Sequence, residues 1–248
     1  VPAAIPYIIK ARGNWRTIKA FVEKHASDRV RALELLSTLS DKDLRDMPME
    51  ILEDNMSAPS DQLSPRVENE MILKPFKHFF AKTFSKEAQT FRNNPALLVN
   101  WIQKNIKMNP DKHAMRIPQT PISVWECRVA DDRSRDIFFV DVARSIGIDA
   151  RKDAVTGKIQ YKKDGNWMDV DFDTTVQQVA KTGTLILNYT PTEYLDDPKY
   201  YTHFTISKII NGRTWLMNFD EGQLDMGGGT TWSNVFKKGT TLDEGTYL

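Results

Sequence analysis

The sequence predicts an α+β fold in which helices come first and strands follow. Residues up to about 110 show helical periodicity, and one long apolar helix is expected within residues 131–146. Beyond this helix, the sequence pattern predicts strands and turns. Because helices and strands are segregated rather than alternating, a βαβ architecture is not expected.

The N-terminal helices are predicted from apolar faces and from residues that cap helix ends. Ile18, Phe21 and Val22 share one helical face with Trp15. Further helix starts are predicted at Asp28, at Ser40 with Asp43 three residues later, at Ser64-Pro65 and at Asn94-Pro95. A helical region over residues 1–110 follows from these signals.

The central segment begins with a loop over residues 108–123, which contains three prolines. The stretch DDRSRDIFFVDVARSIGIDAR, residues 131–151, then predicts a helix that ends at Gly147. Its carboxylates are expected on a solvated face, with those near the helix start favoured by the helix dipole. They are Asp131, Asp132, Asp136 and Asp141.

The strands begin with a hairpin over residues 158–171, whose turn contains Asp164-Gly165. More strands are predicted within 185–187, 203–209 and 214–218, the last two joined by Asn211-Gly212. Gly227-Gly228-Gly229 is not a phosphate-binding loop, because no Lys-Ser/Thr and no helix follow it. The predicted domains are residues 1–110, 111–180 and 181–248, the last being the start of a truncated β-rich domain.

Composition limits the classes of function. The net charge is +1, and no apolar run is long enough to span a membrane, so neither nucleic acid nor a membrane span is expected. The single cysteine, Cys127, excludes an internal disulfide. The four histidines have no ligand-like spacing, so no metal and no cofactor is predicted.

Two segments carry a resemblance to a known family. The segments Ala143–Arg151 (ARSIGIDAR) and Trp167–Asp173 (WMDVDFD) resemble sequence motifs of the transglutaminase-like superfamily. The fold of this superfamily is similar to that of papain-like cysteine proteases. The runs Arg66–Glu70 and Tyr200–Phe204 also look like the large transglutaminase-domain proteins of gut Bacteroidetes. This resemblance implies a transglutaminase-like core at 111–180 and an exported protein, periplasmic or a surface lipoprotein of the bacterial cell envelope.

The resemblance also implies a Cys-His-Asp triad, in which a thiolate attacks an amide carbonyl. The nucleophile position falls on Asp132, which we interpret as a helix cap. The histidine position lies between Val155 and Tyr161, where the sequence has no histidine. Only the third position is kept, as Asp171. The residues therefore favour a catalytically degenerate module over an enzyme.

Cys127 is the alternative nucleophile. In Val124–Val129 it lies on the apolar side of a strand-like alternation, which predicts a buried core residue. A functional thiol would require His113 or His203 from far along the chain.

Three hypotheses follow. The first is a degenerate module that binds a peptide or glycan chain, or scaffolds other domains of the same parent chain. The second is a protease-like amide hydrolase or transferase that uses Cys127, and the third is a structural spacer. A carboxylate pair of Asp132 with Asp171 acting on glycosidic bonds is a further alternative. Arg144 and Arg151 are interpreted as structural, and the tryptophans as core unless a pair of them is exposed.

Overall fold

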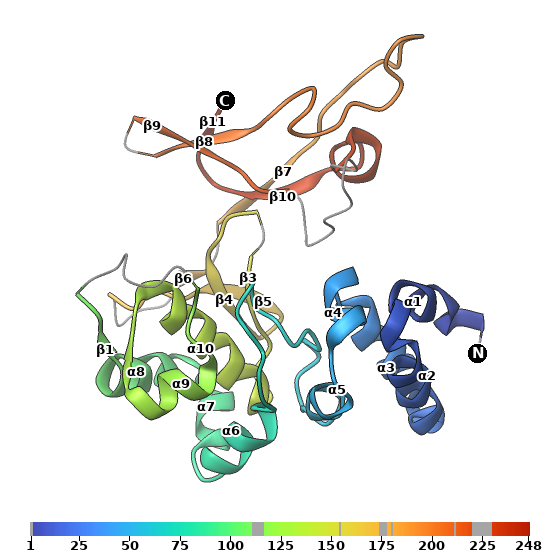
Figure 1. Cartoon of the computed structure of the whole chain (residues 1–248). Coiled ribbons are helices and arrows are strands. Elements are labelled where there is room, and N and C mark those ends of the chain that lie inside the picture. The colour runs from blue at the N-terminus through green and yellow to red at the C-terminus, as the bar shows by residue number, and fades with distance from the viewer. Residues whose placement is uncertain are drawn as a thin grey trace. The chain divides into compact units, whose positions relative to one another are not determined.

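The computed structural model describes residues 2–110, 117–153, 155–173, 178–179, 181–210, 212–219 and 230–248. It contains both helices and strands, so the predicted α+β class is confirmed in its general form (Figure 1). The chain divides into two compact units, each described by itself below. Unit 1 comprises residues 1–152 and 159–178, and unit 2 comprises residues 153–158 and 179–248. The predicted boundaries near 110 and 180 stay predictions.

Five short helices form the first part of unit 1. They are α1 Ile5–Lys10, α2 Trp15–Lys24, α3 Arg29–Ser37, α4 Asp41–Asp46 and α5 Met49–Met56, with 3₁₀ turns at Pro2–Ala4, Arg12–Asn14 and Ala26–Asp28. Ile18, Phe21 and Val22 are buried as predicted, whereas Trp15 is 41% exposed. The apolar face expected for the helix after Asp28, with Val30, Leu33, Leu36 and Leu39 on one side, is wrong in part, because Val30 is 71% exposed and Leu35 is buried instead.

The predicted helix caps have different outcomes. Ser40 caps α4 as expected, because its hydroxyl accepts from the amide of Asp43 at 3.1 Å and donates to the Asp43 carboxylate at 3.0 Å. Asp28 stands at the N-cap of α3 but makes no side-chain cap hydrogen bond. The predicted helix at Ser64-Pro65 is wrong, because residues 57–76 run as an irregular connection. There the buried carboxylate of Glu70 binds the amides of Val67 and Glu68, at 2.7 and 2.9 Å.

The second part of unit 1 contains the helices α6 Lys77–Thr83, α7 Ala88–Asn93, α8 Ala96–Asn105, α9 Pro121–Cys127 and α10 Asp132–Ser145. A short parallel pair joins β1 Lys107–Met108 to β2 Val129–Ala130. Helix α10 is buried along residues 137–145, and Phe138, Phe139, Val140, Val142 and Ala143 belong to one hydrophobic core. A helix segment that is buried on all sides lies inside a domain rather than on its surface.

A four-stranded sheet lies against α10. Its order is β3 Ala150–Lys152, β4 Ile159–Lys163, β5 Asn166–Asp169 and β6 Gln178–Val179, with β3, β4 and β5 antiparallel. The hairpin predicted between residues 158 and 171 is confirmed, since Lys163 pairs with Asn166 across Asp164 and Gly165, which both have positive φ. Helix α10 packs on β3 and β4, so the helix forms one layer and the strands that follow it form a second layer against it (Figure 1).

Unit 2 is built of strands. β7 Thr182–Leu185 pairs with β10 Thr240–Asp243, and a second sheet has the order β11 Thr246–Tyr247, β8 Ser207–Ile210, β9 Arg213–Leu216. A π-helical turn covers Trp232–Phe236. The predicted pairing of the last two strands is confirmed, although β8 begins only at Ser207. Asn211 and the predicted glycine loop at 227–229 lie outside the described residues.

Candidate functional site at the N-terminus of α10

The N-terminus of α10 is capped by Asp131. Its backbone is extended, and its carboxylate accepts from the amide of Ser134 at 2.7 Å. Asp132 is already the first helical residue. The prediction that Asp132 is the cap is therefore wrong by one position, because a capping side chain must come from the extended residue before the first turn.

Asp132 is held by an arginine of its own helix. The Asp132 carboxylate lies 3.6 Å from the guanidinium of Arg135, and 48% of the Asp132 side chain is exposed. Arg135 is 15% exposed, and its guanidinium carbon lies 4.1 Å from the centroid of the Phe172 ring. Arg135 thus joins the first turn of α10 to the segment that follows β5.

The predicted third triad position is exposed. Asp171 follows the end of β5, and its carboxylate accepts from the amide of Asp173 at 2.8 Å. The neighbouring Phe172 is buried, and its carbonyl accepts from the side chain of Gln103 on α8. The structure brings the Asp132 and Asp171 segments together through Arg135, which contacts Asp132 and lies over the ring of Phe172.

Asp136, one turn further along α10, has a raised pKa. Burial raises the pKa of Asp136 to about 6, opposed by the positive charges of Arg135 and Lys152. Close by, Glu68 accepts from Arg133 at 2.9 Å and from Lys152 at 2.9 Å. Burial alone would raise the pKa of Glu68, but these two partners outweigh it and lower that pKa.

The prediction that the acidic residues of α10 lie on a solvated face is wrong for two of them. Asp131 is 5% exposed and Asp141 is fully buried. Burial, followed by the charge of Glu70, raises the pKa of Asp141 well above its ordinary value. Lys77 is also buried, and burial, followed by the charge of Arg144, lowers its pKa. Among the described residues, neither the Lys77 ammonium nor the Asp141 carboxylate has a hydrogen-bond partner.

Arg144 and Arg151 are structural, as interpreted from the sequence. Arg144 donates to the carbonyls of Ala150, Ser64 and Arg66, at 2.9, 3.0 and 3.0 Å, and so fastens the 57–76 connection to α10. The guanidinium of Arg151 lies 4.1 Å from the ring centroid of Trp167 on β5. At the position where the family has proline, the carboxylate of Asp149 binds the same connection through the hydroxyl of Ser60 at 2.8 Å.

Cys127 differs most from its prediction. It ends helix α9 and is exposed, whereas the sequence suggested a buried strand residue. Thr120 caps this helix by accepting from the amide of Ser123 at 3.1 Å, and Pro121 occupies its first turn. These start signals outweigh a short alternation of apolar residues. His203 belongs to unit 2, and His113 lies outside the described residues.

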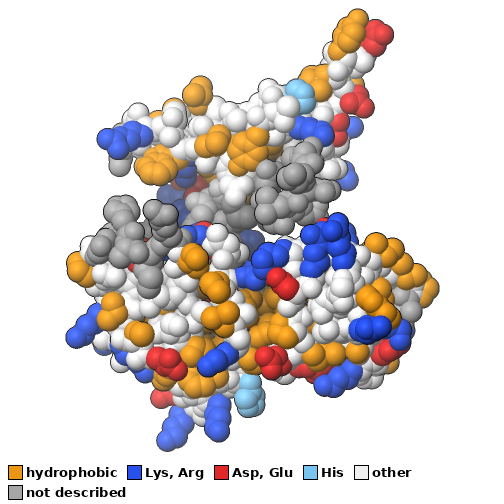
Figure 2. Space-filling view, in the orientation of Figure 1, with side chains coloured by type: hydrophobic (Ala, Val, Ile, Leu, Met, Phe, Trp, Pro, Cys, Tyr) orange, Lys and Arg blue, Asp and Glu red, His pale blue; other side chains and the backbone are white. Residues whose placement is uncertain are grey.

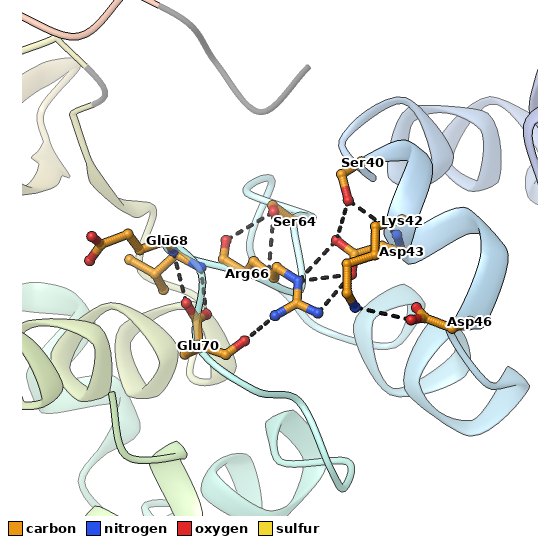
Figure 3. A network of polar contacts seen from close by, with 9 residues as sticks. Ser40, Lys42, Asp43, Asp46, Ser64, Arg66, Glu68 and Glu70 are labelled. Atoms are coloured by element: carbon orange, nitrogen blue, oxygen red, sulfur yellow. Dashed lines mark hydrogen bonds and ion pairs between the residues drawn. The ribbon is translucent and has the colours of Figure 1, made fainter. Parts of the chain in front are cut away.

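A surface hollow of about 260 Å³ lies over α4, α5 and the connection. Lys42, Asp46, Met47, Arg66, Met71 and Leu73 are among the residues that line it. Its charged groups are already paired, Lys42 with Asp46 at 3.0 Å and Arg66 with Asp43 at 2.7 Å (Figure 3). The hollow therefore presents methionine and leucine side chains rather than a reactive group.

On the face shown in Figure 2, acidic and basic side chains are interspersed with hydrophobic ones. In the described part of the chain, no three His, Cys, Asp or Glu side chains are placed to hold a metal ion. No described helix has the length and hydropathy required to cross a membrane.

Comparison with known proteins identifies no relative. No family model, no curated protein sequence and no solved structure matches the chain.

Proposed function

We propose that this chain is a catalytically degenerate module of the transglutaminase-like type that binds a ligand or scaffolds neighbouring domains. The order of its elements supports this proposal. A buried helix, α10, is followed directly by three antiparallel strands, β3 to β5, and β3 and β4 pack against it. In the family that the sequence resembles, the same order carries the nucleophile at the helix start and the other two triad members on the strands.

The contact of Arg135 with Asp132 and Phe172 is the observation on which the proposal rests. Where the family has a thiol facing an imidazole, this chain has a carboxylate paired with a guanidinium that lies on an aromatic ring. A carboxylate is a poorer nucleophile toward an amide than the thiolate of the family triad, because a thiolate is intrinsically very nucleophilic. The arrangement suits recognition of a polar ligand better than bond cleavage.

The proposed ligand is an extended peptide or glycan chain, and the proposed location is the bacterial cell envelope, as a periplasmic protein or surface lipoprotein. Both follow from the resemblance of the sequence. Other domains of the same parent chain are the further proposed partners.

The experiment measures two quantities on the same preparation. Ammonia release from a glutamine-containing peptide reports amide chemistry, and fluorescence anisotropy of labelled, unfolded casein reports binding of an extended chain. We expect no ammonia release above that of a Cys127→Ala variant. We also expect binding that Arg135→Ala weakens and that Arg29→Ala, at the exposed first residue of α3, leaves unchanged. Turnover lost in Cys127→Ala would overturn the proposal, and an absence of binding would favour the spacer.

The exposure of Cys127 favours a second candidate, the cysteine-dependent amide hydrolase or transferase. An exposed thiol is accessible to substrate, which a buried one is not. Among the described residues, however, no histidine contacts this thiol. The same ammonia assay separates the two candidates, because only the enzyme depends on Cys127.

A further inference from the structure

Two tryptophans of unit 1 form a rigid aromatic pair at the surface. The rings of Trp101 on α8 and Trp125 on α9 lie nearly parallel, at 11°, with centroids 5.8 Å apart. The edge contacts of Phe79, Phe80 and Phe84 fix the orientation of Trp125, at centroid distances of 6.2, 6.1 and 5.5 Å. Both tryptophans are partly buried, and Phe79 beside them is 40% exposed.

Arg128 lies across this pair. Its guanidinium carbon is 3.7 Å from the ring centroid of Trp125 and 5.4 Å from that of Trp101. Arg128 follows the last residue of α9 and has a left-handed backbone, with φ of 57°. Its amide and its carbonyl are both bound, to Val124 and Lys107, so the position of the residue is fixed.

The guanidinium of Arg128 has no oxygen partner in the part of the chain that the structure describes. This distinguishes it from Arg66, Arg133 and Arg144 of the same unit. Arg66 and Arg133 each bind a carboxylate, and Arg144 binds three backbone carbonyls. Burial also lowers the pKa of Arg128, although a guanidinium remains charged at every physiological pH. A fork of N–H donors is therefore held in place with no acceptor among the described residues.

We propose that Arg128, Trp101 and Trp125 form a binding site for a carboxylate-bearing saccharide, such as a uronic acid. A planar guanidinium donates two parallel hydrogen bonds to a carboxylate. The partly exposed indoles and Phe79 provide apolar surface for the C–H face of the sugar ring, while its hydroxyls remain in water. The rigid aromatic frame means that little side-chain freedom is lost when the ligand binds.

A saccharide fits better than an extended acidic peptide. Arg128 presents a single guanidinium for one acidic group, and the described side chains that it packs against are the aromatic rings of Trp101 and Trp125. A strand-like peptide would also need unpaired backbone groups along an edge, and helices α6, α8 and α9 offer none. This inference is independent of the proposed function, because it concerns a different part of unit 1 from the start of α10.

The experiment is a titration of the whole chain with a short oligogalacturonide, followed by tryptophan fluorescence and calorimetry. The neutral galactose oligomer and oligoglutamate are the comparison ligands. The variant Arg128→Gly removes the guanidinium, and glycine suits the left-handed backbone at this position. Arg12→Gly is the matched control. Arg12 is exposed and also has a positive φ, of 47°, and its replacement by glycine removes the same charge.

We expect the oligogalacturonide to bind, and its affinity to fall at least about tenfold in Arg128→Gly and to stay unchanged in Arg12→Gly. Arg128→Lys should recover only part of the affinity, because an ammonium cannot bind a carboxylate through a planar fork. Binding should weaken as salt is added. Equal affinity for the neutral oligomer, tighter binding of oligoglutamate, or the same loss in both glycine variants would each overturn the proposal.

Discussion

Arg66 binds the carboxylate of Asp43 through both of its oxygens. The Nε atom lies 2.9 Å from each oxygen, and one terminal nitrogen lies 2.7 Å from Oδ1 (Figure 3). A second terminal nitrogen donates to the carbonyl of Glu70. Only 4% of the Asp43 side chain is exposed, so this pair fastens the 57–76 connection to α4 in a nearly dry environment.

Removing this arginine should destabilise the chain strongly. Arg66→Ala leaves a buried carboxylate without its cation, and we expect a loss of about 3–5 kcal/mol in the free energy of unfolding. The nearby pair of Lys42 with Asp46 has the same kind of contact at 3.0 Å but is exposed, so Lys42→Ala should cost less than about 1 kcal/mol. Urea denaturation measures both, and equal losses would contradict the burial argument.

Gly147 should tolerate alanine less well than Gly165 does. Both have positive φ, of 85° and 82°. A Cβ atom at Gly147 would lie 3.3 Å from the ring of Pro59, whereas at Gly165 nothing lies within 4 Å. We expect Gly165→Ala to lose about 1 kcal/mol from backbone strain alone, and Gly147→Ala to lose more. The difference between their unfolding free energies measures the contact with Pro59. If the two losses are the same, the ring moves aside without cost.

The sequence predicted local features more successfully than buried charge. The termination of α10 just before Gly147 and the turn at Asp164-Gly165 depend on nearby residues, and both predictions were confirmed. The raised pKa of Asp141 depends on its burial and then on the charge of Glu70, which lies far away in the sequence, and no local pattern reveals either. One signal was present, because the apolar residues around Asp141 cover more than one face of the helix.

At the candidate site, too, local features were predicted from the sequence and long-range contacts were not. The sequence placed Asp132 at the start of α10, but the role of Arg135 depends on its contact with Phe172, which lies on another element. For Cys127, a capped helix start at Thr120 competed with a short strand-like alternation, and the helix prevailed. Short segments of this kind are decided by packing rather than by local preference.

The Cys127 thiol should react with iodoacetamide in the folded protein. It is exposed at the end of α9, so native and denatured chains should be labelled to the same extent without prior unfolding. The binding of casein and the unfolding free energy should be unchanged in Cys127→Ser. Rapid labelling at acidic pH would instead indicate an activated thiolate and would favour the cysteine-enzyme candidate. If iodoacetamide labels the Cys127 thiol only after denaturant is added, the thiol is buried in the folded protein, which would contradict its exposure at the end of α9.

Asp136 should make the chain less stable as the pH rises from about 4 to about 6. Burial raises its pKa in the folded state to about 6, above the ordinary value of 3.8. Between these values the folded state holds a proton that the unfolded state has lost, so its stability falls through this window and is then constant. The shift corresponds to roughly 1–3 kcal/mol, since Arg135 and solvent offset part of the burial cost.

Asp136→Asn removes this titration and tests it directly. The variant keeps the size of the side chain and cannot ionise, so its stability should exceed that of the parent at pH 7 and match it near pH 4. Asp164→Asn, in the exposed turn of the β4–β5 hairpin, is the control and should leave the pH profile unchanged. Urea denaturation at half-unit steps of pH measures all three proteins. A parent profile that rises between pH 4 and 6, with the same slope in Asp136→Asn, would mean that other carboxylates, such as Glu68 with its lowered pKa, dominate this range.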